Sequence, residues 1–92
     1  MELKRAHVVV SGVVQGVSFR AYAKAKAVEL SLAGFVRNLP DGDVEVVLEG
    51  PGAQVELMIA WCHRGAPLAH VENVVVDWQP YQGEYQGFSI RW

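Results

Sequence analysis

The order of two hydrophobic periodicities constrains the fold of this chain more than any other feature of its sequence. Runs with apolar residues at every second position are typical of strands, and runs with apolar residues at every third or fourth position are typical of helices. These runs predict strands at 6–11, 35–38, 44–49, 71–78 and 88–92, and helices at 19–33 and 51–65. The order strand–helix–strand–strand–helix–strand predicts an α+β, ferredoxin-like βαββαβ sandwich, in which an antiparallel sheet carries two helices on one face and a short C-terminal strand follows.

The residues at the segment ends support this division. Ser18 is expected to cap the first helix, and Gly34 is expected to end it. Proline, aspartate and glycine follow one another within 39–43, which predicts a hairpin turn there. In the strand after this turn, valine and leucine alternate with Glu45 and Glu49, so we expect one buried face and one mostly polar face.

The stretch from Gly12 to Arg20 joins the first predicted strand to the first predicted helix. Backbone N–H groups at a helix start have no partner within the helix, and they lie at the positive end of the helix dipole, where anions bind. Arg20 is unexpected there, because a cation in the first turn opposes the dipole by roughly 0.3–1 kcal/mol. A phosphate bound between the guanidinium and the N–H groups would explain both features.

The predicted topology brings Asn38 to the same edge of the sheet. In a βαββαβ sandwich the first two strands run parallel, with the third between them, so their C-terminal ends share one edge. The end of the first strand and Asn38 are then two strand spacings apart, roughly 10 Å. A phosphate group and one water molecule would fit between them.

Length and composition limit the class of protein. Ninety-two residues, 51% of them apolar, indicate a single globular domain over 1–92. The net charge of -2 argues against general binding of nucleic acid, which normally accompanies a basic excess. No segment approaches the roughly 20 apolar residues that cross a bilayer, and the N-terminus lacks the apolar run of a signal peptide. Cys62 is the single cysteine, so we expect no internal disulfide and a cytoplasmic location, with no membrane association.

Several residues with reactive or charged side chains have simpler interpretations. Cys62, His63 and His70 lack a fourth partner and a known metal-ligand spacing, so we predict no metal site and an inert, buried Cys62. His7 is expected to be a partly exposed strand residue, and Arg37 an exposed one. Phe19 is expected to belong to the core.

Two stretches of the chain resemble the signatures of the acylphosphatase family. The first is Gly12-Val13-Val14-Gln15-Gly16-Val17-Ser18-Phe19-Arg20. The second is Gly34-Phe35-Val36-Arg37-Asn38, followed by Gly42-Asp43-Val44 and Gly50. The closing residues 88–92 also resemble the C-terminal strand of the family, so the resemblance covers nearly the whole chain.

The resemblance implies a small enzyme that hydrolyses acyl phosphates to a carboxylate and inorganic phosphate, without a metal or other cofactor. It implies that Arg20 and Asn38 are the catalytic pair, with Arg20 holding the phosphate and Asn38 positioning the water. The phosphate would also bind the backbone N–H groups of Gln15, Gly16, Val17, Ser18, Phe19 and Arg20. The side chain of Gln15 could support the loop or line the site. The expected partners are a small-molecule acyl phosphate and, as competing anions, inorganic phosphate or sulfate, with no nucleic acid or membrane, and the protein is expected to be a monomer.

Two other functions are compatible with the same fold. One is a non-catalytic module that binds phosphate or RNA, although the strands lack an aromatic RNA-binding motif and the net charge is negative. The other is a domain that channels carbamoyl phosphate at the head of a larger maturation protein, which a chain of 92 residues without a partner domain disfavours.

Overall fold

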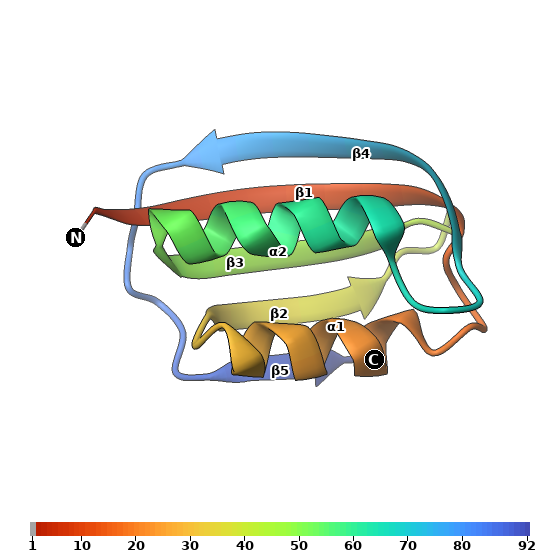
Figure 1. Ribbon diagram of the computed structural model, residues 1–92, viewed down its shortest axis with the longest axis horizontal. Coiled ribbons are helices and arrows are strands. Elements are labelled where there is room, and N and C mark those ends of the chain that lie inside the picture. Colours follow the sequence, from red (N-terminus) through yellow and green to blue (C-terminus); the bar gives the residue numbers. More distant parts are fainter. Residues whose placement is uncertain (1) are drawn as a thin grey trace.

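The computed structural model describes residues 2–92, and its helices and strands follow the predicted order. The elements are β1 (Leu3–Val13), α1 (Phe19–Glu29), β2 (Ala33–Asn38), β3 (Val44–Pro51), α2 (Gly52–Arg64), β4 (His70–Gln79) and β5 (Phe88–Arg91). The strands form one sheet in the order β4-β1-β3-β2-β5, and both helices cover the same face of it (Figure 1). The predicted ferredoxin-like α+β sandwich is therefore confirmed.

The strand directions are those that the predicted site requires. β1 and β2 are both antiparallel to β3, so they run parallel to each other with β3 between them. β5 pairs with β2 in parallel at one edge of the sheet, and its C-terminal end lies near the start of α1 (Figure 1). The C-terminal ends of β1, β2 and β5 therefore meet at one end of the molecule.

The core lies between the sheet and the two helices. Alternate residues of the two central strands are fully buried, among them Val8 and Val10 of β1. Ala23 and Ala27 of α1 are also fully buried, and their small side chains allow this helix to lie close to the sheet. The buried residues of α2 include Val55, Met58 and Cys62.

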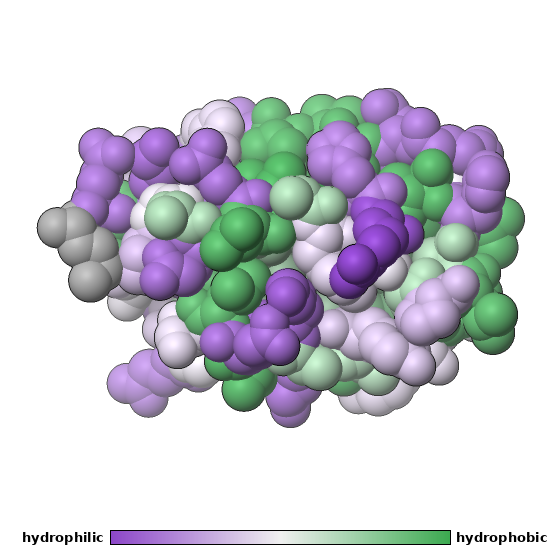
Figure 2. Space-filling model, viewed as in Figure 1, coloured by the Kyte–Doolittle hydropathy of each residue, from purple (hydrophilic) through white to green (hydrophobic). Residues whose placement is uncertain are grey.

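The outer surface of the helical layer is mixed in character. Figure 2 shows that this face carries apolar residues in several separate areas, which polar residues interrupt. Neither α1 nor α2, the two helices within residues 2–92, has the length and apolar character needed to cross a membrane.

The first helix ends earlier than predicted. It stops at Glu29 instead of residue 33, and the residue in the left-handed conformation is Ser31, with φ 57°. The N–H of Ser31 donates to Val28 O, and the N–H of Leu32 donates to Ala27 O, which is the Schellman pattern of helix termination. Gly34 was wrongly predicted to end the helix: it lies within β2.

The polar face of β3 is also less exposed than its alternating pattern predicts. Glu49 is 2% exposed, because the connection between β4 and β5 crosses the end of the sheet and covers it. Its carboxylate accepts hydrogen bonds from the backbone N–H groups of Gln82, Gly83 and Glu84 and from the Arg5 guanidinium. A single carboxylate thus fastens residues 82–84 to the sheet.

Candidate active site

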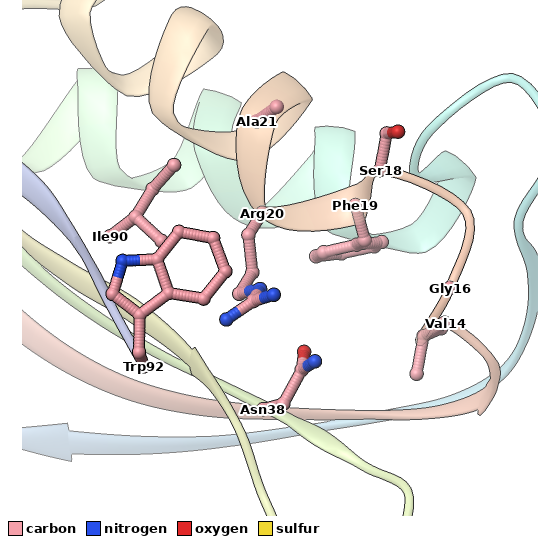
Figure 3. A pocket seen from close by; sticks show the side chains of 9 residues that line it. All are labelled: Val14, Gly16, Ser18, Phe19, Arg20, Ala21, Asn38, Ile90 and Trp92. Carbon is pink, nitrogen blue, oxygen red and sulfur yellow. The ribbon is translucent and has the colours of Figure 1, made fainter.

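A cavity of about 360 Å³ opens at the end of the sheet where β1, β2 and β5 end. Both signature stretches and the last residues of the chain contribute to its wall (Figure 3). The lining residues are Val14, Gly16, Ser18, Phe19, Arg20, Ala21, Asn38, Ile90 and Trp92.

A β-bulge sets the path of the loop that leaves β1. The pairing of β1 with β4 shifts register between Ser11 and Gly12, and Gly12 has φ 123°. A Cβ at Gly12 would lie 2.2 Å from the carbonyl oxygen of His70, closer than any side chain can approach. A glycine is therefore required here for the strand to bend into the loop.

The start of α1 leaves its backbone donors free. Ser18 occupies the N-cap position, but it has φ 61° and its side chain makes no capping hydrogen bond, so the predicted capping role is wrong. Ser18 is in the left-handed region, whereas a capping side chain requires an extended backbone to reach the N–H groups ahead of it. Within residues 2–92 no protein acceptor is recorded for the N–H groups from Gln15 to Arg20. They remain available to an anion.

Arg20 extends from the first turn of α1 into the cavity (Figure 3). Its Nη1 donates to the carbonyl oxygen of Arg91, 3.2 Å away. Its guanidinium carbon lies 4.1 Å from the centre of the Trp92 ring, within the range of a cation–π interaction. Arg91 and Trp92 thus both hold the guanidinium in place.

Asn38 is the last residue of β2, and its side chain points into the same cavity, opposite Arg20 (Figure 3). The turn after it is held by bonds from the N–H of Leu39 to Asp43 O and from the N–H of Gly42 to Leu39 O. The side chain of Gln15 also reaches this turn, where its Nε2 donates to the carbonyl oxygens of Leu39 and Asp43, at 2.8 Å each. Of the two roles considered for Gln15, its contacts therefore favour support of the loops.

The other members of the predicted phosphate loop are divided between core and surface. Phe19 is 2% exposed and packs against Trp61 with 5.3 Å between ring centres, so its predicted place in the core is confirmed even though one edge lines the cavity. Val17 packs partly against the core, while Gly16 is exposed. Val17 and Phe19 thus anchor the loop to the core, while Gly16 and Ser18 line the cavity.

The remaining candidate residues lie elsewhere. His7 contacts Glu45 at 2.7 Å on the face of the sheet that the helices do not cover, and the exposed Arg37 pairs with the same carboxylate. Burial by itself raises the pKa of Glu45, but its hydrogen bonds to His7 and Arg37 outweigh burial, and the pKa is lowered. Burial raises the pKa of the Cys62 thiol to about 12, so this thiol is inert as predicted. In residues 2–92 no three His, Cys, Asp or Glu side chains are grouped in a way that could hold a metal ion.

The apolar wall of the cavity was not predicted from the sequence. Ile90 and Trp92 form this wall, and they belong to a segment that its pattern predicted only as a short strand. Only the parallel pairing of β5 with β2 places them beside Arg20, and the signal for that pairing is absent from the signature stretches.

Known proteins resemble this chain over nearly its whole length. The sequence model of the acylphosphatase family matches residues 6–90. An acylphosphatase of Aeropyrum pernix is 54% identical over 91 residues, which cover 98% of this chain and 90% of that protein. The crystal structure of an acylphosphatase from Bacillus subtilis superposes with a TM-score of 0.93 at 32% identity, covering 99% of this chain and all of the other. The structure of HypF from T. kodakarensis also superposes, with a TM-score of 0.82 at 34% identity, and the match covers 96% of this chain and 12% of that protein. The chain therefore belongs to the acylphosphatase family.

Proposed function

We propose that this hydrolase cleaves acyl phosphates to a carboxylate and inorganic phosphate by direct in-line attack of a water molecule that Asn38 positions. The observation that carries the proposal is the shared cavity, into which Arg20 and Asn38 both point beside a loop with free backbone N–H groups. Membership of the acylphosphatase family supports the class of reaction.

In this proposal the phosphoryl group binds to Arg20 and to the N–H groups of Gln15 through Arg20. A guanidinium has five N–H donors, of which one is used on Arg91 O, so a bidentate pair remains for two phosphoryl oxygens. The successive N–H groups of the loop form a concave anion site for the remaining charge. Donors fixed in this way stabilise the equatorial oxygens of the transition state, where most of the catalysis of phosphoryl transfer arises.

Asn38 has the chemistry needed to orient water. Its side-chain oxygen accepts a hydrogen bond from the water molecule and places the water oxygen in line with the bond to be broken. The water oxygen bonds to phosphorus as the bond from phosphorus to the acyl oxygen breaks, and that bonding pair leaves with the carboxylate. Both water protons remain on the product, which departs as dihydrogen phosphate.

The chemistry of the leaving group explains why no acid or base is needed. A carboxylate is a weak base and leaves without being protonated, and in a loose transition state the water keeps most of its proton. No titrating side chain then takes part, so kcat should stay constant between about pH 5 and pH 8. A bell-shaped profile within this range would reveal an acid or base that the proposal lacks.

The test is release of inorganic phosphate from benzoyl phosphate by the wild type and three variants. Arg20→Ala should lower kcat/KM by about 10²–10³-fold and weaken inhibition by inorganic phosphate, since it removes a main anion contact. Asn38→Ala should lower kcat by about 10²-fold and leave phosphate inhibition nearly unchanged. Arg37→Ala is the matched control: it removes the neighbouring side chain, which pairs with Glu45 on the opposite face, and should leave both constants at wild-type values.

Each outcome distinguishes one part of the proposal. A wild-type protein that binds phosphate but releases none from benzoyl phosphate would be a non-catalytic binding module. An Asn38→Ala variant with wild-type kcat would contradict the role of Asn38 in positioning water. An Arg20→Ala variant with unchanged phosphate inhibition would place the anion elsewhere.

We further propose that the enzyme is a cytoplasmic monomer. The apolar areas on its helical face are separate and interrupted, whereas stable partners bury large continuous patches. Its one cysteine is buried and free, so the fold does not depend on an oxidising compartment. Sedimentation at micromolar concentration tests the oligomeric state.

A further inference from the structure

The side chain of Gln15 connects the two halves of the site. Its Nε2 donates to Leu39 O and to Asp43 O, which both belong to the turn that follows Asn38. The side chain is partly buried, and its two hydrogen bonds are short and equal at 2.8 Å. Among the hydrogen bonds of residues 2–92, these two alone join the 14–18 loop to the 39–43 turn.

The sheet itself does not fix this distance. β3 separates β1 from β2, and its first residue, Val44, pairs with Val10 on one side and with Asn38 on the other. Beyond Val44 β3 pairs with neither strand, and the end of β1 pairs only with β4, on the side away from β2. No strand pairing therefore joins the loop after β1 to the turn after β2. Two strand spacings, roughly 10 Å, lie between their strands there.

The chemistry of the link selects an amide. Two carbonyl oxygens face one nitrogen, and the NH₂ group of glutamine supplies two donors without a charge. A carboxylate of the same shape has no donor, and a thioether of similar length has none either. Both hydrogen bonds therefore depend on the amide nitrogen.

We propose that Gln15 is a positioning residue that sets the distance between the phosphate loop and Asn38, and so between the phosphorus atom and the attacking water. The inference rests on the proposed function, because it requires that Asn38 orients the water. Gln15 acts on the water through the turn that follows Asn38, because its side chain binds that turn and does not line the cavity. Loss of the link should lower kcat and leave phosphate affinity in place, since the N–H groups that bind phosphate belong to the backbone.

The first measurement compares the wild type with Gln15→Met, which keeps the length of the side chain and removes both donors. With benzoyl phosphate as substrate, kcat should fall by about 10–100-fold, because a misplacement of 1 Å costs on that order. The inhibition constant of inorganic phosphate should change by less than about threefold. A purely structural role would instead weaken phosphate binding together with kcat, and unchanged kcat would overturn the inference outright.

A double-mutant cycle then tests whether Gln15 acts through Asn38. In the Asn38→Ala background no side chain remains for the turn to position, so adding Gln15→Met should lower kcat by less than about twofold. If the two losses multiply, Gln15 acts independently of Asn38 and the inference fails.

The pH profile of Gln15→Glu gives a third readout. Above its pKa the introduced carboxyl has no proton to donate and faces two carbonyl oxygens, while the protonated form donates one hydrogen bond. Activity of this variant should therefore rise as the pH falls from 8 to 5, whereas the wild-type profile stays flat. A flat profile for this variant contradicts the link. If the wild type itself released no phosphate, the proposed function would fail, and the inference would fail with it. If the wild type were active and the Gln15 variants kept the wild-type kcat, the inference alone would fail.

Discussion

Replacing Glu49 with glutamine should lower the free energy of unfolding by about 2.5–4.5 kcal/mol at pH 7. Oε2 of Glu49 accepts from Arg5 Nη1 at 3.1 Å, from the N–H of Gln82 at 3.1 Å and from the N–H of Gly83 at 3.2 Å, and Oε1 accepts from the N–H of Glu84 at 2.9 Å. A glutamine oxygen can replace Oε2, so three bonds survive without their charge and lose about 0.5 kcal/mol each. The NH₂ group must then face the N–H of Glu84, and one buried donor left unpaired costs about 1–3 kcal/mol.

The pH dependence distinguishes the charge of Glu49 from its shape. Burial alone raises the pKa of Glu49, but the hydrogen bonds from the N–H of Gln82, from Arg5 and from the N–H of Glu84 outweigh burial, so the pKa is lowered. A group with a lowered pKa in the folded state stabilises the protein fully above its unfolded pKa, about 4.3, and loses this effect as the pH falls through the folded pKa. The difference in stability between wild type and Glu49→Gln should therefore be largest near pH 7 and decrease below about pH 4.

The assay is urea unfolding, followed by tryptophan fluorescence at pH 7, 5 and 3. The slope of the unfolding free energy against urea concentration should stay the same, because the surface exposed on unfolding is unchanged. For a domain of this size the expected loss at pH 7 corresponds to a decrease in Tm of roughly 10–35 °C. The control is Glu84→Gln, whose half-exposed side chain also pairs with Arg5 and should cost less than about 1 kcal/mol. An equal loss for Glu49→Gln at pH 3 and pH 7 would refute the role of the charge.

Two further substitutions probe the sheet and the cavity wall. Gly34→Ala should destabilise the protein by about 3 kcal/mol or more in thermal denaturation, because a Cβ there would lie 1.8 Å from Val47 O at φ 137°. Gly42→Ala, at φ 99° with no atom within 4 Å of its Cβ, should cost only about 1 kcal/mol. Equal losses for the two variants would show that backbone strain, and not the contact with Val47 O, determines the loss of stability. Trp92→Ala removes the ring from the Arg20 guanidinium and should weaken phosphate binding by about two- to fivefold, the equivalent of an exposed cation–π pair. Because the Trp92 side chain is 93% exposed, Tm should hardly change, and unaltered phosphate affinity would contradict the stacking role.

The fold was predictable because its determinants are local and repeat along the chain. Valines at alternate positions of β1 and alanines at helical spacing in α1 each indicate an element, and the order of the elements admits few topologies. The end of α1 was predicted wrongly because glycine commonly ends helices, whereas Gly34 lies within β2. It allows β2 to approach Val47 O, and Ser31 adopts the left-handed conformation in its place.

The shared position of Arg20 and Asn38 at one cavity was predictable for a different reason. Arg20 contradicts the preference of a helix N-terminus, and Asn38 ends a strand that the topology places at the same edge as the loop. Each departs from what its element alone requires, and such departures concentrate at functional sites. Trp92 has no such signal, because an aromatic residue in a closing strand satisfies every local preference.

The burial of Glu49 was not predicted, and the sequence left two roles open for Gln15, because the partners of both side chains are backbone groups of distant segments. Glu49 binds N–H groups 33–35 residues away, and Gln15 binds carbonyl oxygens 24 and 28 residues away. Any residue can supply a backbone partner, so no pattern in residues 82–84 or 39–43 indicates the contact. The two side chains hold segments 82–84 and 39–43, which lie beyond the ends of the strands, where strand pairing no longer fixes the chain. The interior of this sheet is therefore determined by periodic side chains, whereas the loops where the proposed chemistry occurs depend on single polar side chains that reach across the sheet ends.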